Sequence, residues 1–220
     1  MRSLRSLITA ALVLATLPSL AFAQRGREFD NSWFWGLKAG GFSFADSTGA
    51  NRTAASVGVD WLITRTHAGL YVAGSESFLH LGTRLPVDPT SGDTTIRAAH
   101  LRNLRRLDAA VVGFPGDHLR WHPYVGAGFV LSQIANATPV GPFARQDQVS
   151  FDSATVVQTR TGFSPLFLGG LQYRFKPASV FGQLELSPAQ KNFLLYNGRT
   201  FYYSFELGVR YNFGTSISDE

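Results

Sequence analysis

The sequence predicts an all-β fold, an eight-stranded antiparallel up-and-down transmembrane β-barrel. Three features predict it: segments in which apolar and polar residues alternate, connections that alternate between long and short, and aromatic residues that gather at one level. The last segment, F-Y-Y-S-F-E-L-G-V-R-Y-N-F from Phe201 to Phe213, alternates most regularly. Successive side chains of a strand point to opposite faces, so one face is apolar and the other mostly polar. A transmembrane barrel turns the apolar face to lipid and the polar face to its lumen.

The N-terminal segment 1–23 is predicted to be a signal peptide. Two arginines precede an apolar run from Leu7 to Leu20, and Ala21-Phe22-Ala23 forms a small-x-small cleavage site before Gln24. The run is short for a membrane anchor, which needs about 20 apolar residues. Residues 24–220 then form one barrel domain with a short C-terminal tail, 214–220. No later run is long enough for a spanning helix, so any membrane crossing must use strands.

Composition narrows the remaining classes of protein. The chain has no cysteine, so an exported domain would depend on hydrogen bonding and packing rather than on disulfides. The formal net charge is +5, but the basic residues are dispersed along the chain. A protein that binds nucleic acid would concentrate them, so no nucleic-acid partner is expected.

Eight strands are expected from the alternating segments. In the second of them, Val57, Val59 and Trp61 share one face, while Gly58 and Asp60 share the other. The contrast between the two faces is weakest in the third. The strands cover about Ser32–Phe44, Thr53–Thr64, Ala68–Leu79, Asn103–Phe114, Trp121–Ile134, Thr161–Phe175, Ser179–Leu186 and Thr200–Phe213.

The connections between these strands alternate in length. The long ones lie near Ser43–Arg52, Gly82–Arg102, Ala135–Gln158 and Ser187–Arg199. The short ones lie near Arg65–His67, Pro115–Arg120 and Lys176–Ala178. Outer-membrane barrels have short periplasmic turns and long extracellular loops, whereas a soluble sandwich has no reason to sort its connections in this way.

Aromatic residues mark the periplasmic level of the predicted barrel. Aromatic rings with a polar edge favour the interface between membrane and water, so we expect an aromatic girdle there. Its members are Trp33, Trp35, Trp61, Trp121, Tyr173, Tyr211 and Phe213, and Tyr124 is expected at the same level. The alternative is a set of core aromatics in a soluble fold.

The inward faces of the strands collect charged residues. The set comprises Lys38, Asp60, Arg106, Asp108, Arg174, Glu185, Glu206 and Arg210. The lumen of an eight-stranded barrel is just wide enough for side chains, and an isolated buried charge is costly, so these groups should pair. They predict a salt-bridged plug or a gated pore whose pairs exchange partners, and conductance would separate the two.

Strand register makes these expectations specific. The first and last strands should pair and close the barrel, which brings Lys38 and Glu206 into one network with Arg210 nearer the periplasm. Glu206 and Arg210 should face inward, and a slip of one residue would invert this. The residues expected to face outward are Val57, Val59, Leu171, Val180, Leu184, Phe205, Leu207 and Val209.

Catalysis would require a nucleophile, a base and an orienting acid near one rim. Only His80 has such groups near it in sequence, namely Ser75, Glu76 and Ser77. This cluster lacks the His-x-Ser arrangement of lipid A deacylases, and no histidine pair has metal-ligand spacing. No enzyme activity, metal or cofactor is therefore expected.

With these features the chain resembles the small eight-stranded bacterial outer-membrane β-barrels, the family that contains the OmpA membrane domain and OmpX. The resemblance rests on the signal peptide, the alternating strands, the aromatic strand ends and the terminal Phe213. It implies an outer-membrane location with both termini in the periplasm. It also implies contact with outer-membrane lipid and lipopolysaccharide, and recognition of the C-terminal strand by the barrel-assembly machinery. The tail Gly214–Glu220 departs from the family, in which the chain often stops at the terminal aromatic residue.

The expected function is a structural or surface-interaction role, with no surface ligand identified by the loops. A small-solute pore or transporter is the main alternative, and a lipid A-modifying enzyme is another. A soluble lipocalin-like binder would need an apolar lumen, which Asp60, Arg174, Glu206 and Arg210 oppose.

Overall fold

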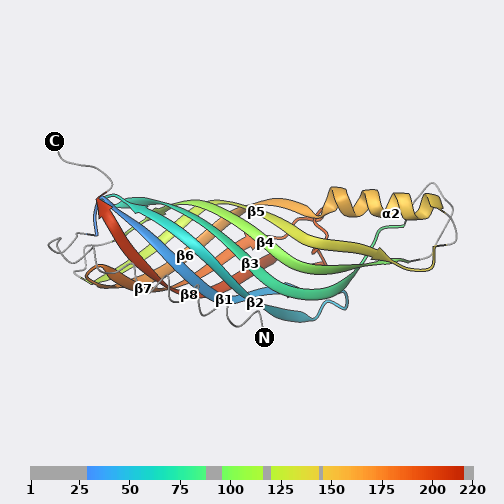
Figure 1. The fold of residues 1–220 in the computed structure, drawn as a ribbon, viewed down its shortest axis with the longest axis horizontal. Helices are drawn as coiled ribbons and strands as arrows, with labels where there is room; N and C mark the ends of the chain where they lie inside the picture. Colours follow the sequence, from blue (N-terminus) through green and yellow to red (C-terminus); the bar gives the residue numbers. More distant parts are fainter. Residues whose placement is uncertain (1–28, 88–95, 116–119, 144–145, 216–220) are drawn as a thin grey trace, which may run out of the picture.

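Eight antiparallel strands, paired in chain order, close into a barrel in the computed structural model, which describes residues 29–87, 96–115, 120–143 and 146–215 (Figure 1). The predicted signal peptide, 1–23, lies outside the described residues. Within these ranges one helix, α2 (Gln146–Thr159), lies between the fifth and sixth strands. The strands are β1 (Ser32–Ala45), β2 (Asn51–Thr64), β3 (Ala68–Arg84), β4 (Ala98–Gly113), β5 (Trp121–Val140), β6 (Thr161–Phe175), β7 (Ala178–Pro188) and β8 (Phe201–Thr215).

The first and last strands form the closing seam, which confirms the prediction. β1 pairs with β8 from Ser32 to Ser43, with Lys38 opposite Gly208 and Gly40 opposite Glu206. Closure gives the backbone groups of both strands a partner and leaves no free edge at the seam. A strand surrounded by lipid requires this, because lipid offers no hydrogen bonds.

The two ends of the barrel differ in their connections, and the predicted alternation of lengths holds except at the β1–β2 connection, 46–50, which is shorter than the turn 114–120. The turn end carries the short connections 65–67, 114–120 and 176–177. The loop end carries the connections 46–50, 85–97, 141–160 and 189–200, of which the last three are longer than any at the turn end and the third contains α2. In Figure 1 the turn end lies on the left and the loop end, with α2, on the right.

Side chains alternate across the barrel wall in the predicted register. Leu207 is 56% exposed on the outside, whereas its neighbour Glu206 is 1% exposed and faces the lumen, as does Arg210. The outward residues named from the sequence are all exposed: Val57, Val59, Leu171, Val180, Leu184, Phe205, Leu207 and Val209. The apolar face of the sheet therefore lies outside, the reverse of a soluble barrel.

Three strands extend further toward the loop end than predicted. Their observed limits are Arg84 for β3, Ala98 for β4 and Val140 for β5, against predicted limits at Leu79, Asn103 and Ile134. At this level the register of β3 and β4 shifts, so that Phe78 and Leu79 oppose the single residue Asn103, whose φ is 56°. This β-bulge shifts the inward parity of β4 between Leu101 and Leu104, so the sequence pattern of β4 ended before the strand did, whereas burial in β3 alternates without a break to Arg84.

Helix α2 occupies part of the predicted loop Ala135–Gln158, which is a second correction. Val156 packs into the loop-end interior, and buried Asp152 accepts a hydrogen bond of 2.6 Å from Arg97 Nε, just before β4. The helix is rich in Ser, Thr and Val, which have low helix propensity, so these tertiary contacts stabilise it. No helix in the described part of the chain is long and apolar enough to cross a membrane.

The interior of the barrel has three layers, which can be followed along single strands. Along β1, inward Phe34 belongs to an apolar turn-end cluster, Lys38 to a charged layer, and Phe42 to an apolar loop-end cluster. The turn-end cluster comprises Phe29, Phe34, Leu62, Tyr71, Ala73, Ala110, Val112, Phe114, Tyr124, Val130, Leu166 and Leu168. The loop-end cluster comprises Phe42, Phe44, Ala54, Leu79, Leu81, Leu85, Ala99, Leu101, Leu104, Ile134, Val156, Phe193, Leu194, Leu195 and Tyr202.

Candidate functional site in the barrel lumen

The candidate site is the charged layer between the two apolar clusters. We call it the lumenal charge layer. Its side chains are all buried, and all of them were predicted to face the lumen. They are Lys38, Asp60, Arg106, Asp108, Glu185, Glu206 and Arg210, from β1, β2, β4, β7 and β8. Each occupies an inward position because it falls on the polar parity of its strand.

Lys38 is the centre of one group of ion pairs. Its Nζ lies 2.6 Å from Glu206 Oε2, 3.3 Å from Glu185 Oε1 and 3.8 Å from Asp108 Oδ2. The contact with Glu206 crosses the seam, so the two residues are direct partners. Arg106 Nη2 shares the other two carboxylates, 2.8 Å from Glu185 and 3.1 Å from Asp108. Two cations thus hold three carboxylates, one each from β4, β7 and β8.

Arg210 forms a second group nearer the turn end, where it was predicted. Its Nε donates to Asp60 Oδ2 at 2.7 Å, and its Nη1 donates to Gln172 Oε1 at 2.8 Å. The guanidinium carbon lies 3.7 Å from the centroid of the Phe181 ring. A planar guanidinium can stack on an aromatic face while it donates in its plane, which a lysine ammonium cannot do.

Gln183 joins the two groups, and the sequence analysis missed it. Its Nε2 donates to Glu185 Oε1 at 2.8 Å and to Glu206 Oε2 at 2.9 Å. Its Oε1 accepts from the Tyr124 hydroxyl at 2.9 Å and from Arg210 Nη2 at 3.4 Å. A neutral amide carries no charge signal in the sequence. Its inward parity on β7, two residues before Glu185, was the signal that could have identified it.

Two glycines make room for the long charged side chains. A Cβ at Gly36 would overlap Asp60 Oδ1 and lie 2.8 Å from Arg210 Cγ. A Cβ at Gly58 would lie 3.1 Å from Lys38 Cε and 2.5 Å from the carbonyl oxygen of Gly74. Both positions face the lumen, so a small residue there lets the cations cross toward their carboxylates.

The balance of charge explains why the layer must act as a unit. It contains three cations and four carboxyl groups, and each cation lies within 3.3 Å of at least one carboxylate. Moving an ion out of water costs several kcal/mol, and only close pairing with further hydrogen bonds offsets that cost. Removing one member would leave a buried charge without compensation. The arrangement can hold the wall together and fill the lumen.

Two predicted positions need correction. Arg174 is half-buried opposite Ser179, next to the turn between β6 and β7, and so lies near the turn end rather than in the layer. Tyr124 was expected at the level of the girdle but faces inward, 2% exposed, and donates to Gln183. The outward parity of β5 begins at Trp121, three residues earlier, and therefore places Tyr124 inside.

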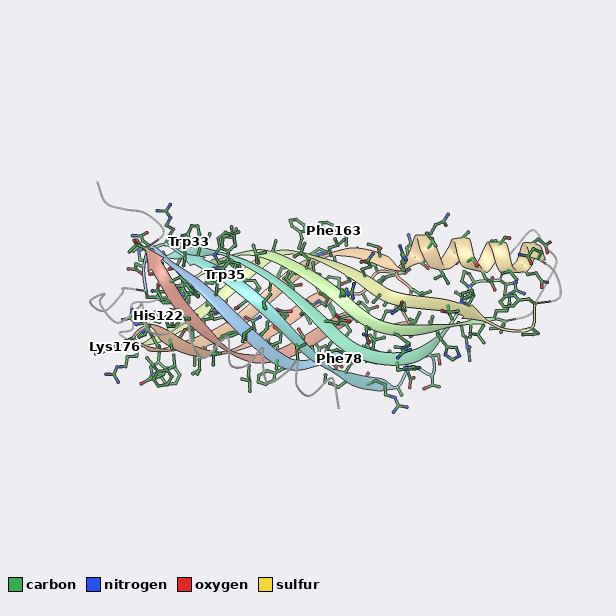
Figure 2. All side chains as sticks on the ribbon, in the orientation of Figure 1. Trp33, Trp35, Phe78, His122, Phe163 and Lys176 are labelled. Atoms are coloured by element: carbon green, nitrogen blue, oxygen red, sulfur yellow. The ribbon has the colours of Figure 1, made fainter. Side chains whose placement is uncertain are left out.

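The other predicted girdle residues face outward near the turn end. Trp35 lies opposite Trp61 with ring centroids 5.7 Å apart, and Trp121 lies opposite Tyr173 at 4.5 Å. Figure 2 places Trp33 and Trp35 toward the turn end, and Phe78 and Phe163 about halfway along the molecule. The remaining members are Trp33, Tyr211 and Phe213, and exposed Phe175, which contacts Tyr173, was missed.

The histidine cluster considered for catalysis is divided by the barrel wall. Ser75 and Ser77 are buried on the inner face of β3, whereas Glu76 and His80 lie on its outer face. The candidate nucleophiles and the candidate base therefore point away from each other, and this cluster cannot form a triad.

The fold and the lumen together define a class: a closed eight-stranded antiparallel barrel with an apolar exterior and buried salt bridges inside. The crystal structure of Neisserial surface protein A, NspA, is similar, with a TM-score of 0.51 and 13% sequence identity over 82% of this chain and 97% of NspA. This likeness concerns the fold. No sequence-family model and no curated protein matches the chain.

Two further solved structures give lower scores. The attachment invasion locus protein Ail of Yersinia pestis has a TM-score of 0.46 and 9% identity over 84% of this chain and 99% of Ail. A de novo designed transmembrane β-barrel has a TM-score of 0.43 and 12% identity over 84% of this chain and 98% of the design.

Proposed function

We propose that this protein is an integral barrel of a bacterial outer membrane, without enzyme activity, whose lumenal charge layer is a structural plug. The observation that carries the proposal is the sorting of side chains across one wall. Phe205, Leu207 and Val209 are more than half exposed, while Glu206 and Arg210 between and beside them are buried. Exposing an apolar belt of this extent to water would be unfavourable in free energy, whereas contact with lipid is favourable.

The plug follows from the order of the interior layers. A solute moving along the axis would meet one apolar cluster, the lumenal charge layer and then the other apolar cluster. Passage would require the Lys38–Glu206 and Arg210–Asp60 contacts to break. Breaking buried pairs is costly, which supports a structural plug over a pore.

Conductance and thermal stability test the plug together. We expect neither the wild-type protein nor Glu206→Ala to carry a steady current in planar bilayers. The variant should lose about 3–5 kcal/mol of stability, less if water reaches Lys38, because the lysine is left without its nearest carboxylate. Glu76→Ala, which removes an outward carboxylate, is the control and should change little. Unchanged melting of Glu206→Ala with a large new current would favour the pore.

We infer that the turn end and both termini face the periplasm and that the loop end faces outward. The support is the length of the connections and the girdle of Trp33, Trp35 and Trp121. Because the chain has no cysteine, single cysteines are clean probes. An impermeant maleimide on intact cells should label Ser150→Cys in α2 but label Lys176→Cys only after lysis. The opposite pattern would reverse the orientation.

The surface-interaction role belongs, on this proposal, to the loop end. Function on a rigid scaffold usually lies on its loops, and α2 is held there by the Arg97–Asp152 ion pair. Replacing 146–159 by a flexible linker should leave the heat-modifiable gel mobility of the barrel intact. Binding of the cells to a surface partner would be reduced if α2 contributes to it.

The C-terminal strand is the inferred contact for the barrel-assembly machinery. Its outward aromatic series ends at exposed Phe213, at the turn end. Phe213→Ala should lower the amount of protein in the outer membrane of cells while refolding in detergent stays unchanged. Equal loss in both assays would indicate a defect of folding instead.

A further inference from the structure

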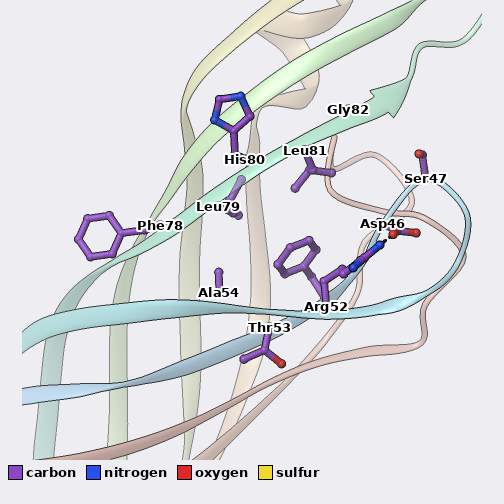
Figure 3. A pocket seen from close by; sticks show the side chains of 11 residues that line it. Asp46, Ser47, Arg52, Thr53, Ala54, Phe78, Leu79, His80, Leu81 and Gly82 are labelled. Carbon is purple, nitrogen blue, oxygen red and sulfur yellow. Dashed lines mark hydrogen bonds and ion pairs between the residues drawn. The ribbon is translucent and has the colours of Figure 1, made fainter.

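β2 and β3 separate on the loop-end side of the barrel. Their ladder begins at Thr64 and Gly69 and stops at Ser56 and Ser77. Beyond that point β2 continues to Asn51, paired only with β1, and β3 continues to Arg84, paired only with β4. Figure 3 shows the two ribbons diverging on either side of a pocket. The wall of the barrel is therefore laterally open between these strands.

The bulge in β3 accounts for the separation. Phe78 and Leu79 directly follow the last paired residue, Ser77, and oppose Asn103 on β4. Asn103 adopts a left-handed φ of 56° and donates from Nδ2 to Glu76 Oε1 at 2.9 Å. A bulge bends its strand and increases the local twist, so β3 follows β4 and leaves β2. The opening is thus built into the backbone.

The opening contains a pocket of about 410 Å³ with an apolar floor. Its floor is formed by Phe44, Ala54, Leu79 and Leu81, all members of the loop-end apolar cluster. The volume lies within the range of pockets that bind small molecules, about 300–1,000 Å³. An apolar group could enter through the wall and contact the interior of the barrel without crossing either end.

The rim of the pocket is polar and adjoins a basic surface. Arg52 pairs with Asp46 at 2.9 Å across the mouth, as the dashed line in Figure 3 marks, so this part of the rim is neutral. His80, also at the mouth, belongs to an exposed set of basic residues on the outer face of β3 and β4, and the acid beside this set is Glu76, 3.6 Å from Arg105. The set, which we call the basic face, comprises His80, Arg84, His100, Arg102 and Arg105.

The outer face changes from apolar to basic around Phe78. Phe78 is 53% exposed on the outer wall, and His80 is the next outward residue of β3 toward the loop end, while the Glu76–Arg105 pair lies one outward position nearer the turn end. In the orientation proposed above, this is the level at which the hydrocarbon core meets the outer head groups. An amphipathic molecule with an anionic head would place each part against a matching surface there.

We propose that the opening between β2 and β3 binds an acylated, phosphate-bearing lipid of the outer leaflet. One acyl chain occupies the pocket above Leu79 and Leu81, and the phosphate groups contact the basic face. The inference rests on the proposed membrane function and orientation, because these bring the opening to the lipid head groups. The chemistry selects an anionic lipid, since the excess charge beside the pocket is positive.

The test uses the full-length protein folded in neutral detergent, with heat-modifiable mobility as the measure of folding. Native mass spectrometry would compare retention of purified lipid A, lipid A without its acyl chains, and phosphatidylcholine. We expect lipid A to be retained best. Arg102→Gln and Arg105→Gln should each weaken retention about fivefold, the equivalent of the ~1 kcal/mol that a basic residue contributes near an anionic surface.

Two glycines of β3 provide matched variants for the acyl chain. A Cβ at either Gly82 or Gly74 meets no atom within 4 Å, but only Gly82 lines the pocket. Gly82→Trp should reduce lipid A retention several-fold, and Gly74→Trp should not, with both barrels folded normally. Equal retention by the two variants would overturn the proposal. So would equal binding of deacylated lipid A or phosphatidylcholine, or a peptide retained in place of lipid. Loss of heat-modifiable mobility in the wild type would instead refute the membrane barrel itself.

Discussion

The turn-end half and the loop-end half of this barrel follow different structural rules. In the turn-end half β2 and β3 stay paired from Ser56 to Thr64, and alternation is regular. In the loop-end half a bulge shifts the register, two strands part, and a helix packs beside the sheet. A wall within the hydrocarbon core must satisfy every backbone group inside the sheet, whereas a wall at or beyond the level of the head groups, where water is present, can leave an edge open. The regularity of strand pairing in each half thus depends on whether hydrocarbon or water surrounds it.

The largest loss of stability should come from substitutions in the lumenal charge layer, which lies against the turn-end half. Arg210→Ala leaves Asp60 buried without its cation and should cost about 3–5 kcal/mol. The measurement is the melting of the heat-modifiable folded band. Asp60→Asn combined with Arg210→Met removes both charges and should recover much of the loss. If the double variant were as unstable as the single one, burial of unpaired charge would not be the cause.

The second effect separates the lipid-facing wall from the wall beyond the bulge. Leu207→Arg should cost about 2–4 kcal/mol, because it places a charge near the bilayer midplane. Thr138→Arg, on the exposed part of β5 beyond the predicted strand end, should stay within about 0.5 kcal/mol. Unfolding titrations in lipid vesicles would measure both. Similar costs at the two sites would remove the difference in environment on which the comparison rests.

A third, more local effect tests how the loop-end half is held. Asp152→Ala removes the buried partner of Arg97 and should cost about 1–3 kcal/mol within α2 and its contacts. Hydrogen exchange of the α2 amides should accelerate, while melting of the barrel should hardly change. Ser150→Ala, on the exposed side of the helix, serves as the control. A fall in melting temperature for Asp152→Ala would mean that the two halves are coupled more strongly than their packing suggests.

The smallest effect is a pH dependence confined to the β1–β2 connection. The Thr48 hydroxyl and then the Arg52 guanidinium, by donating to Asp46, hold the pKa of its carboxyl below its usual range. The contribution of this contact is therefore fully present above the ordinary aspartate pKa of about 4 and is lost only as the pH falls through the lowered value. An NMR titration of the Asp46 carboxyl carbon would show this. Asp46→Asn should abolish the transition, and a midpoint near 4 would contradict the expectation.

Sequence reasoning succeeded for the turn-end half because alternation is a direct imprint of lipid outside and side chains inside. It failed at Asn103 and Ile134, where the inward parity of β4 and β5 changes beside the bulge, and also at Leu79, although burial in β3 continues to alternate. It also missed α2, whose Ser, Thr and Val content resembles a loop and whose stability comes from contacts such as Arg97–Asp152. Long-range contacts leave no local pattern, so these elements could not be predicted from neighbouring residues.

The same distinction applies to the lumenal charge layer. Charges on the inward parity identified its seven charged members, because an ion buried in the lumen requires a partner of opposite charge. Arg174 was placed with them from parity alone. Parity tells which face of the wall a side chain lies on, but not how far the residue lies from the turn. Gln172 and Gln183 carry no charge, so the search for inward charges passed over them, and their hydrogen bonds show their place in the layer.

The position of Gln183 constrains how this protein can diverge in sequence. Its amide turns nitrogen toward the carboxylates and oxygen toward Arg210, so each ion-pair group fixes the orientation that suits the other. Loss of the Arg210–Asp60 pair would allow the amide to rotate and would alter the cost of any later change at Lys38 or Glu206. Substitutions in the two groups should therefore show epistasis. Lineages would be expected to lose or replace the layer in concerted steps and not residue by residue.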